Sequence, residues 1–127
     1  MLRGFEDSER LTEFYAYIQD GEVREAFALL IGTFACLQSV TCRVVKQGSV
    51  RSVGIYQGEK WMFSVMPTQQ RLHFQWRPPA IASSKYDKAS IAAAFPDFSD
   101  HKQEEHWSVY VCSIESALLL LLILDLQ

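Results

Sequence analysis

The sequence lacks the motifs that identify several large classes of enzymes. Its six glycines form neither a Walker loop nor a Gly-x-Gly-x-x-Gly run, which argues against nucleotide hydrolysis and a dinucleotide cofactor. Gly-x-Ser-x-Gly is missing too, and no cysteine stands in a recognisable catalytic context. The sequence therefore gives little support for catalysis and predicts no cofactor.

Cysteines are few, and long hydrophobic runs are missing. Cys36, Cys42 and Cys112 are odd in number and stand outside any Cys-x-x-Cys spacing, so neither a disulfide framework nor a zinc site is predicted. The longest apolar run, residues 117–124, falls well below the roughly 20 residues that a membrane-spanning helix requires. The first residues lack the apolar core of a signal peptide. We therefore expect a cytoplasmic protein without a membrane segment.

What the sequence does contain is patterned for a packed domain. Hydrophobic residues make up 49% of the 127 residues, which is enough for one core. Asp7 or Ser8 is expected to cap a first helix that Asp20 and Gly21 close, and residues 22–38 predict a second, largely buried helix. The expected core side of the two helices consists of Leu11, Phe14, Tyr15, Ile18, Ala26, Phe27, Leu30, Phe34 and Leu37.

From residue 40 the period of the apolar residues changes from 3.6 to 2, which indicates strands joined by short turns. In the third strand, the expected core side is Trp61, Phe63 and Val65. Pro78 and Pro79 end the fourth strand, because proline lacks the donor that a ladder requires, and a loop is expected next. The four strands are predicted at residues 40–46, 50–56, 60–66 and 71–76.

The remaining residues predict a short helix at 88–95, an acidic loop at 97–105, a fifth strand at 106–112 and a last helix capped by Ser113. The order is thus two helices, four strands, helix, strand, helix. This order predicts an α+β fold: one domain over residues 1–127, with an antiparallel sheet of about five strands and helices packed on one face.

Residues 71–77 give the clearest indication of a binding surface, because polar and apolar side chains alternate without a fault. Leu72, Phe74 and Trp76 would enter the core, and the alternate residues would form an open, basic face of the sheet. Together with Tyr56, this face would combine stacking with hydrogen bonding. The candidate ligand-binding residues are Arg71, His73, Gln75, Arg77 and Tyr110.

Charge along the chain is segregated in a way that fits this interpretation. Residues 40–88 hold eight bases and two acids, whereas the flanking segments are acidic. We therefore expect a non-enzymatic binding domain that engages an anionic or aromatic ligand or a partner protein. Nucleic-acid binding through basic hairpins is an alternative, although the pI of about 5.6 implies that it would be local. Bases that merely protect strand edges, or a face covered by a helix or a subunit, are further alternatives.

A second alternative is a small enzyme with a histidine-based site. His73 lies on the candidate strand, where a general base or a phosphate ligand would be useful. His101 and His106, with Glu104 or Glu105, offer ligands for a metal, but their spacing matches no metal-binding helix. No metal is therefore predicted.

The apolar run at residues 117–124 also poses a question of partners. A helix that is apolar all round has to be buried on every side, and in so small a domain one side can meet another chain. The sequence therefore predicts a homodimer through this C-terminal helix, in the two-fold arrangement most common among soluble proteins.

From residue 54 to residue 124 the layout resembles the MmcQ/YjbR-like family of small bacterial α+β proteins. The residues that carry the resemblance are Gly58-Glu-Lys-Trp-Met-Phe63, Leu72-His-Phe-Gln-Trp76 and His106-Trp-Ser-Val-Tyr-Val111, the last followed by a capped helix. The resemblance implies a CyaY-like sheet-and-helix fold and, for some relatives, DNA binding through paired wing-like hairpins. It assigns no functional residue to this chain.

Overall fold

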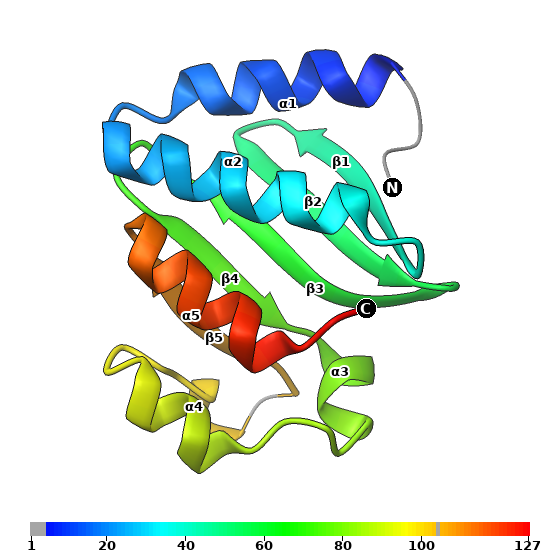
Figure 1. Cartoon of the computed structure of the whole chain (residues 1–127), viewed down its shortest axis with the longest axis vertical. Coiled ribbons are helices and arrows are strands. Elements are labelled where there is room, and N and C mark those ends of the chain that lie inside the picture. The colour runs from blue at the N-terminus through cyan, green and yellow to red at the C-terminus, as the bar shows by residue number, and fades with distance from the viewer. Residues whose placement is uncertain (1–4, 104) are drawn as a thin grey trace.

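The computed structural model describes residues 5–103 and 105–127 and has the predicted α+β architecture. One five-stranded antiparallel sheet carries helices α1, α2 and α5 on one face, as Figure 1 shows. The helices are α1 (Phe5–Tyr17), α2 (Gly21–Cys36), α3 (Pro78–Ala82), α4 (Lys88–Ala94) and α5 (Ile114–Leu124). The strands are β1 (Val40–Gln47), β2 (Val50–Gln57), β3 (Lys60–Pro67), β4 (Leu72–Trp76) and β5 (Trp107–Val111). The predicted fold class and element order are thus confirmed.

The sheet is a meander in which each strand pairs with the next one in the chain, in the order β1-β2-β3-β4-β5. Tight turns join the hairpins at Gly48 and Gly58, whose φ angles of 61° and 63° lie in the left-handed region that glycine adopts at little cost. One irregularity interrupts the ladder: Ile55 pairs with Phe63 and Tyr56 pairs with Trp61, so Met62 has no opposite residue. This is the arrangement of a β-bulge.

The core lies between the sheet and α1, α2 and α5. Leu72, Phe74 and Trp76 of β4 are fully buried, as their alternation predicted. Helix α2, which is capped by the Asp20 side chain accepting from the Val23 amide (3.1 Å), contributes Phe27, Leu30 and Phe34 among others. Burial of such side chains stabilises each of them by roughly 1.5–3 kcal/mol relative to an exposed position. None of the described helices is long and apolar enough to cross a bilayer.

Three details of the helices differ from the sequence-based expectation. Pro78 and Pro79 do not lead into a loop but open the short helix α3, because proline fits the first turn of a helix, where no amide partner is needed. Tyr15 is 41% exposed rather than in the core, and the Arg24 guanidinium carbon lies 5.5 Å from its ring centroid. In α5, Ala117, Leu120 and Leu124 are buried while Leu118, Leu119 and Leu122 are exposed, so this helix is not enclosed on every side.

Candidate functional site

The face of the sheet opposite α1, α2 and α5 carries the predicted binding residues. A row of paired residues crosses all five strands on this face: Arg43, Gly54, Ser64, Gln75 and Ser108. Large side chains stand on either side of this row. We call the whole set the polar face, which comprises the row together with Tyr56, Trp61, Met66, Arg71, His73, Arg77 and Tyr110.

Two arginines and two aromatic rings form one stack on the polar face. The Arg43 guanidinium carbon lies 4.1 Å from the centroid of the Tyr56 ring, and Tyr56 stacks on Trp61 with centroids 5.7 Å apart and planes at 14°. The Arg77 guanidinium carbon lies 3.7 Å from the Trp61 ring. Cation–π contacts of this kind hold a guanidinium in a fixed orientation. Arg77 also donates from Nη1 to the Trp61 carbonyl (3.5 Å), and its other N–H groups remain available to an anion.

The position of Trp61 in this stack corrects the prediction that it lies on the core side of the third strand. The bulge at Met62 adds one residue between Phe63 and Trp61, which reverses the side to which Trp61 points. The Trp61 indole then donates to the Phe63 carbonyl (2.9 Å). A bulge leaves no mark in the alternation of a short strand, so it was not predictable from the sequence.

A second stack holds three of the predicted residues together. The Arg71 guanidinium carbon lies 3.7 Å from the centroid of the Tyr110 ring, and Tyr110 stacks on His73 with centroids 5.1 Å apart. Tyr110 and His73 are direct partners in the β4–β5 ladder. The structure therefore unites Arg71, His73 and Tyr110, whereas Arg77 belongs to the Trp61 stack.

Gln75 occupies a place between the two stacks, in the central row of the polar face. It is paired with Ser64 on one side and with Ser108 on the other. Both serines are buried, at 3% exposure each, so the centre of the polar face consists of short side chains overlain by larger neighbours. Arg43 and Trp61 are members of the site that the sequence did not nominate.

The arginines of the polar face form no ion pair with a described carboxylate, although Asp97 borders this face and accepts from the Tyr110 amide (3.4 Å). Among the described residues, the ion pair that forms is Lys88 with Asp100 (2.9 Å), and it lies away from the two stacks. No described carboxylate pairs with Arg43, Arg71 or Arg77. The Nε of Arg43 is in addition buried without a hydrogen-bond partner in the described structure. Guanidinium groups that lack an internal carboxylate can pair with carboxylates or phosphates from outside.

His73 is held in its neutral form by its surroundings. Burial is the main cause that lowers its pKa below the usual 6.5, electrostatic interactions with His101, Arg71 and His106 lower it further, and Asp97 acts in the opposite direction. The His73 imidazole is therefore a neutral hydrogen-bonding group at neutral pH. The arginines supply the positive charge of the site.

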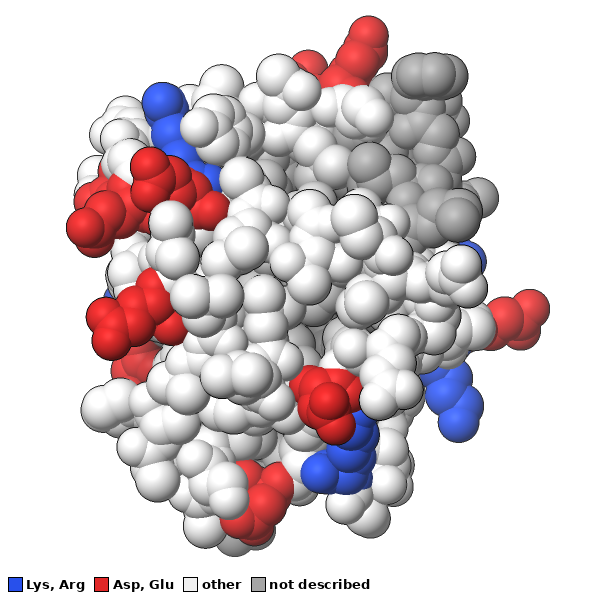
Figure 2. All heavy atoms as spheres, in the orientation of Figure 1, with Lys and Arg blue, Asp and Glu red and all other residues white. Residues whose placement is uncertain are grey.

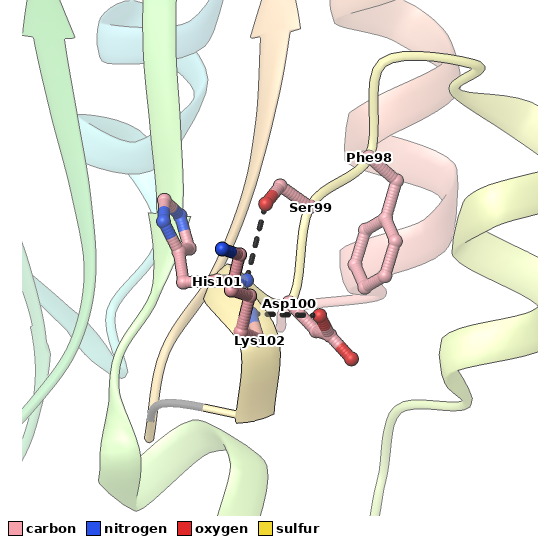
Figure 3. A pocket seen from close by; sticks show the side chains of 5 residues that line it. All are labelled: Phe98, Ser99, Asp100, His101 and Lys102. Carbon is pink, nitrogen blue, oxygen red and sulfur yellow. Dashed lines mark hydrogen bonds between the residues drawn. The ribbon is translucent and has the colours of Figure 1, made fainter.

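The segment after α4 borders the polar face at β5. Ser99 forms a bridge with Ser108, and His101 Nε2 lies 2.8 Å from the Ser108 hydroxyl. A hollow of about 630 Å³ is lined by Phe98, Ser99, Asp100, His101 and Lys102. Figure 3 shows that the rings of Phe98 and His101 point in opposite directions, with His101 directed across β5 toward β4. A smaller cavity of about 240 Å³ lies at the end of β4, between Gln75, Arg77, Pro78, Glu105 and His106.

Three features near this loop bear on its chemistry: a Ser–His contact, a cysteine thiol and the arrangement of metal-ligand residue types. A serine and a histidine in contact can form a nucleophile and its base, but Ser108 is buried and its bond to His101 ties the loop to the sheet. Burial and the nearby Asp97 raise the pKa of Cys112, which keeps its thiol protonated and weakly nucleophilic at neutral pH. Within the described residues, no group of three or more His, Cys, Asp and Glu side chains has the arrangement of a metal site, and Glu104 lies outside those residues.

Comparison of the chain with protein-family models, with curated proteins and with solved structures gives no significant match. These comparisons do not bear on the resemblance to the MmcQ/YjbR-like family, which stays a prediction.

Proposed function

We propose that the chain is a non-enzymatic binding protein whose polar face binds an extended anionic partner, and that this partner is an acidic polypeptide segment. The observation that carries the proposal is the pair of arginines at the two ends of β4. Arg71 is held on Tyr110 and Arg77 on Trp61, and neither forms an ion pair with a described carboxylate. Two oriented and uncompensated guanidinium groups suit bidentate contacts to carboxylates.

The separation of the two arginines supports an extended partner rather than a single small anion. Arg71 and Arg77 are six residues apart along one strand, which corresponds to roughly 20 Å. A single carboxylate or phosphate cannot reach both. A peptide with acidic residues spread along it can contact both arginines and also the hydrogen-bonding side chains of His73 and Gln75 between them.

The aromatic rings favour an acidic peptide over a single-stranded nucleic acid. Proteins that bind single strands stack bases on free aromatic rings. Here Trp61 and Tyr56 stack on each other and on arginines, and Tyr110 stacks on both His73 and Arg71. A base would first have to displace one of these neighbours, whereas a carboxylate needs only the guanidinium edges.

The proposal predicts that single arginine variants weaken the binding of an acidic peptide. A fluorescent oligoglutamate peptide is titrated with the protein, and binding is followed by fluorescence anisotropy at low and at physiological salt. We expect Arg71→Gln and Arg77→Gln each to weaken binding about two- to fivefold, the effect of losing one exposed ion pair of up to about 1 kcal/mol. Binding should also weaken as salt screens the charges.

Arg51→Gln is the matched control, because Arg51 also rests on a tyrosine but on the helix side of the sheet, with its guanidinium carbon 3.5 Å from the Tyr17 ring. This variant should bind like the unaltered protein. Equal losses in all three variants would reduce the effect to net charge and contradict a site on the polar face. An oligothymidine that binds more tightly than the peptide, with the same dependence on Arg71 and Arg77, would instead assign the face to nucleic acid.

We propose further that the chain acts as a homodimer through α5 in a reducing compartment such as the cytoplasm. The exposed apolar residues of α5 support the first statement, because contiguous apolar surface usually marks a contact. The exposed free thiols of Cys36 and Cys112 support the second.

A further inference from the structure

The outer side of α5 presents an apolar stripe that no described element covers. Leu122 is 77% exposed, Leu118 49%, Ile114 41% and Leu119 37%. These residues follow one another at helical spacing, so they share one side of the helix. Figure 2, which views the helix face of the molecule, shows a broad uncharged area at its centre, with acidic side chains toward its margins.

The two ends of this stripe carry different charges. Glu115 is exposed in the first turn of α5, next to Ile114. At the other end, Lys85 is exposed and its Nζ donates to the Asp125 carbonyl just beyond the helix (2.7 Å). The Asp125 side chain adds a carboxylate there, which forms no ion pair with Lys85 among the described residues. The stripe therefore has Glu115 at one end, leucines along its length, and Lys85 together with Asp125 at the other end.

We infer that α5 packs antiparallel against α5 of a second copy, with Leu118 of each chain against Leu122 of the other. This inference rests on the homodimer proposed above and specifies its interface. A two-fold axis midway between Leu118 and Leu122 brings Glu115 of one chain to the position of residue 125 of the other, where Lys85 can meet it. The same axis opposes the helix dipoles, so each negative helix end lies beside a positive one.

A second copy fits the stripe because the stripe is complementary to itself. A two-fold interface requires that the same surface match its own rotated image. Here the rotation places leucine on leucine, and it brings Glu115 of α5 to Lys85, which lies between α3 and α4 and beside the end of α5. The two polar faces then lie on the outer sides of the dimer, because the helix faces meet in the middle.

The interface is tested first by the oligomeric state of the full chain in sedimentation velocity. The unaltered protein should be dimeric, and Leu122→Lys should be monomeric with an unchanged circular dichroism spectrum, because Leu122 is mostly exposed in one chain. Val50→Lys is the matched control: Val50 is 53% exposed but lies at the β1–β2 hairpin, so its dimer should persist. A monomeric unaltered protein, or a dimeric Leu122→Lys variant, would overturn the inference.

The register is tested by disulfide cross-linking in a Cys36→Ser/Cys112→Ser background. Leu118→Cys and Leu122→Cys chains are mixed and oxidised. We expect cross-linked heterodimers to exceed both kinds of cross-linked homodimer, because Leu118 meets Leu122 and not itself. Preferential Leu118→Cys homodimers would establish a dimer of different register and overturn the inferred contact while leaving the dimer proposal intact.

The contact between Glu115 and Lys85 is tested by exchanging the charges of the two residues. Glu115→Lys should weaken the dimer by placing two lysines together, and Lys85→Glu combined with it should restore the association. Failure of the double variant to recover would remove Glu115 and Lys85 from the interface. None of these outcomes affects acidic-peptide binding by the polar face, which is measured separately.

Discussion

Gly54 supports the Arg43–Tyr56–Trp61–Arg77 stack from below. A Cβ atom at this position would lie 2.9 Å from Trp61 Nε1 and 2.9 Å from Tyr56 Cε1, closer than side chains tolerate. Both rings can therefore lie flat over β2 because residue 54 has no side chain. The glycine weakens its strand slightly, and in return the two rings and their arginines are held in place.

Gly54→Ala is expected to destabilise the protein by about 1–3 kcal/mol, since the added methyl group must push aside one of two packed rings. The free energy of unfolding is measured in urea at fixed protein concentration. Gly32→Ala provides the contrast: nothing lies within 4 Å of its Cβ position in α2, and alanine is the better helix former, so stability should rise by about 0.5–1 kcal/mol. A Gly54→Ala variant as stable as the unaltered protein would show that the rings do not rest on residue 54.

His73 makes the stability of the protein depend on pH. Its pKa is lowered in the folded chain, chiefly by burial, so the unfolded chain binds a proton more readily. Above about pH 6.5 His73 is neutral in both states and has no effect; as the pH falls below this value, folding is progressively penalised. His73→Gln should therefore lose less thermal stability between about pH 7 and pH 5. Parallel melting curves for the two proteins across this range would contradict the assignment.

At the level of elements, α5 begins with a reciprocal cap. The Ser113 hydroxyl accepts from the Ser116 amide, and the Ser116 hydroxyl accepts from the Ser113 amide, each at 3.1 Å. This capping box fixes where the helix starts and therefore which side of it faces the core. Serine at position 113 and the apolar run that follows made this helix predictable from the sequence.

Ser113→Ala removes the cap and is expected to cost about 1 kcal/mol, seen as a lower melting temperature at fixed protein concentration. Ser49 is an exposed residue in the β1–β2 turn, so Ser49→Ala removes a hydroxyl without removing a helix cap. This control variant should leave the melting temperature nearly unchanged. Equal shifts in both variants would show that the capping box contributes nothing measurable.

Other elements show why the sequence predicted some features and missed others. The alternation of Leu72, Phe74 and Trp76 correctly placed β4, because a two-residue period is a property of the strand itself. Trp61 was misplaced because a bulge depends on the pairing of two strands. Helix α3 was missed because a proline pair both ends strands and begins helices, and the chain around it decides which.

At the level of the whole molecule, the arrangement of the site depends on which strands pair, and in which register, more than on the residue pattern of any one strand. Sequence alternation nominated Arg71, His73, Gln75 and Arg77 for one face, and the structure places them there. The stacks that orient the arginines join residues from different strands, such as Tyr110 with Arg71 and Tyr56 with Trp61. Cross-strand contacts depend on register, which a single sequence does not specify, so the sequence predicted that these residues share a face but not that they divide into two stacks.

The order of the strands also bears on how the chain folds. Every strand pairs with its neighbour in the sequence, so the first four strands assemble through three successive hairpins that each close a short loop. Helix α5, by contrast, packs against α2 from the opposite end of the chain (Figure 1). We therefore expect the hairpins to form before α5 docks, because docking of α5 on α2 joins segments from opposite ends of the chain.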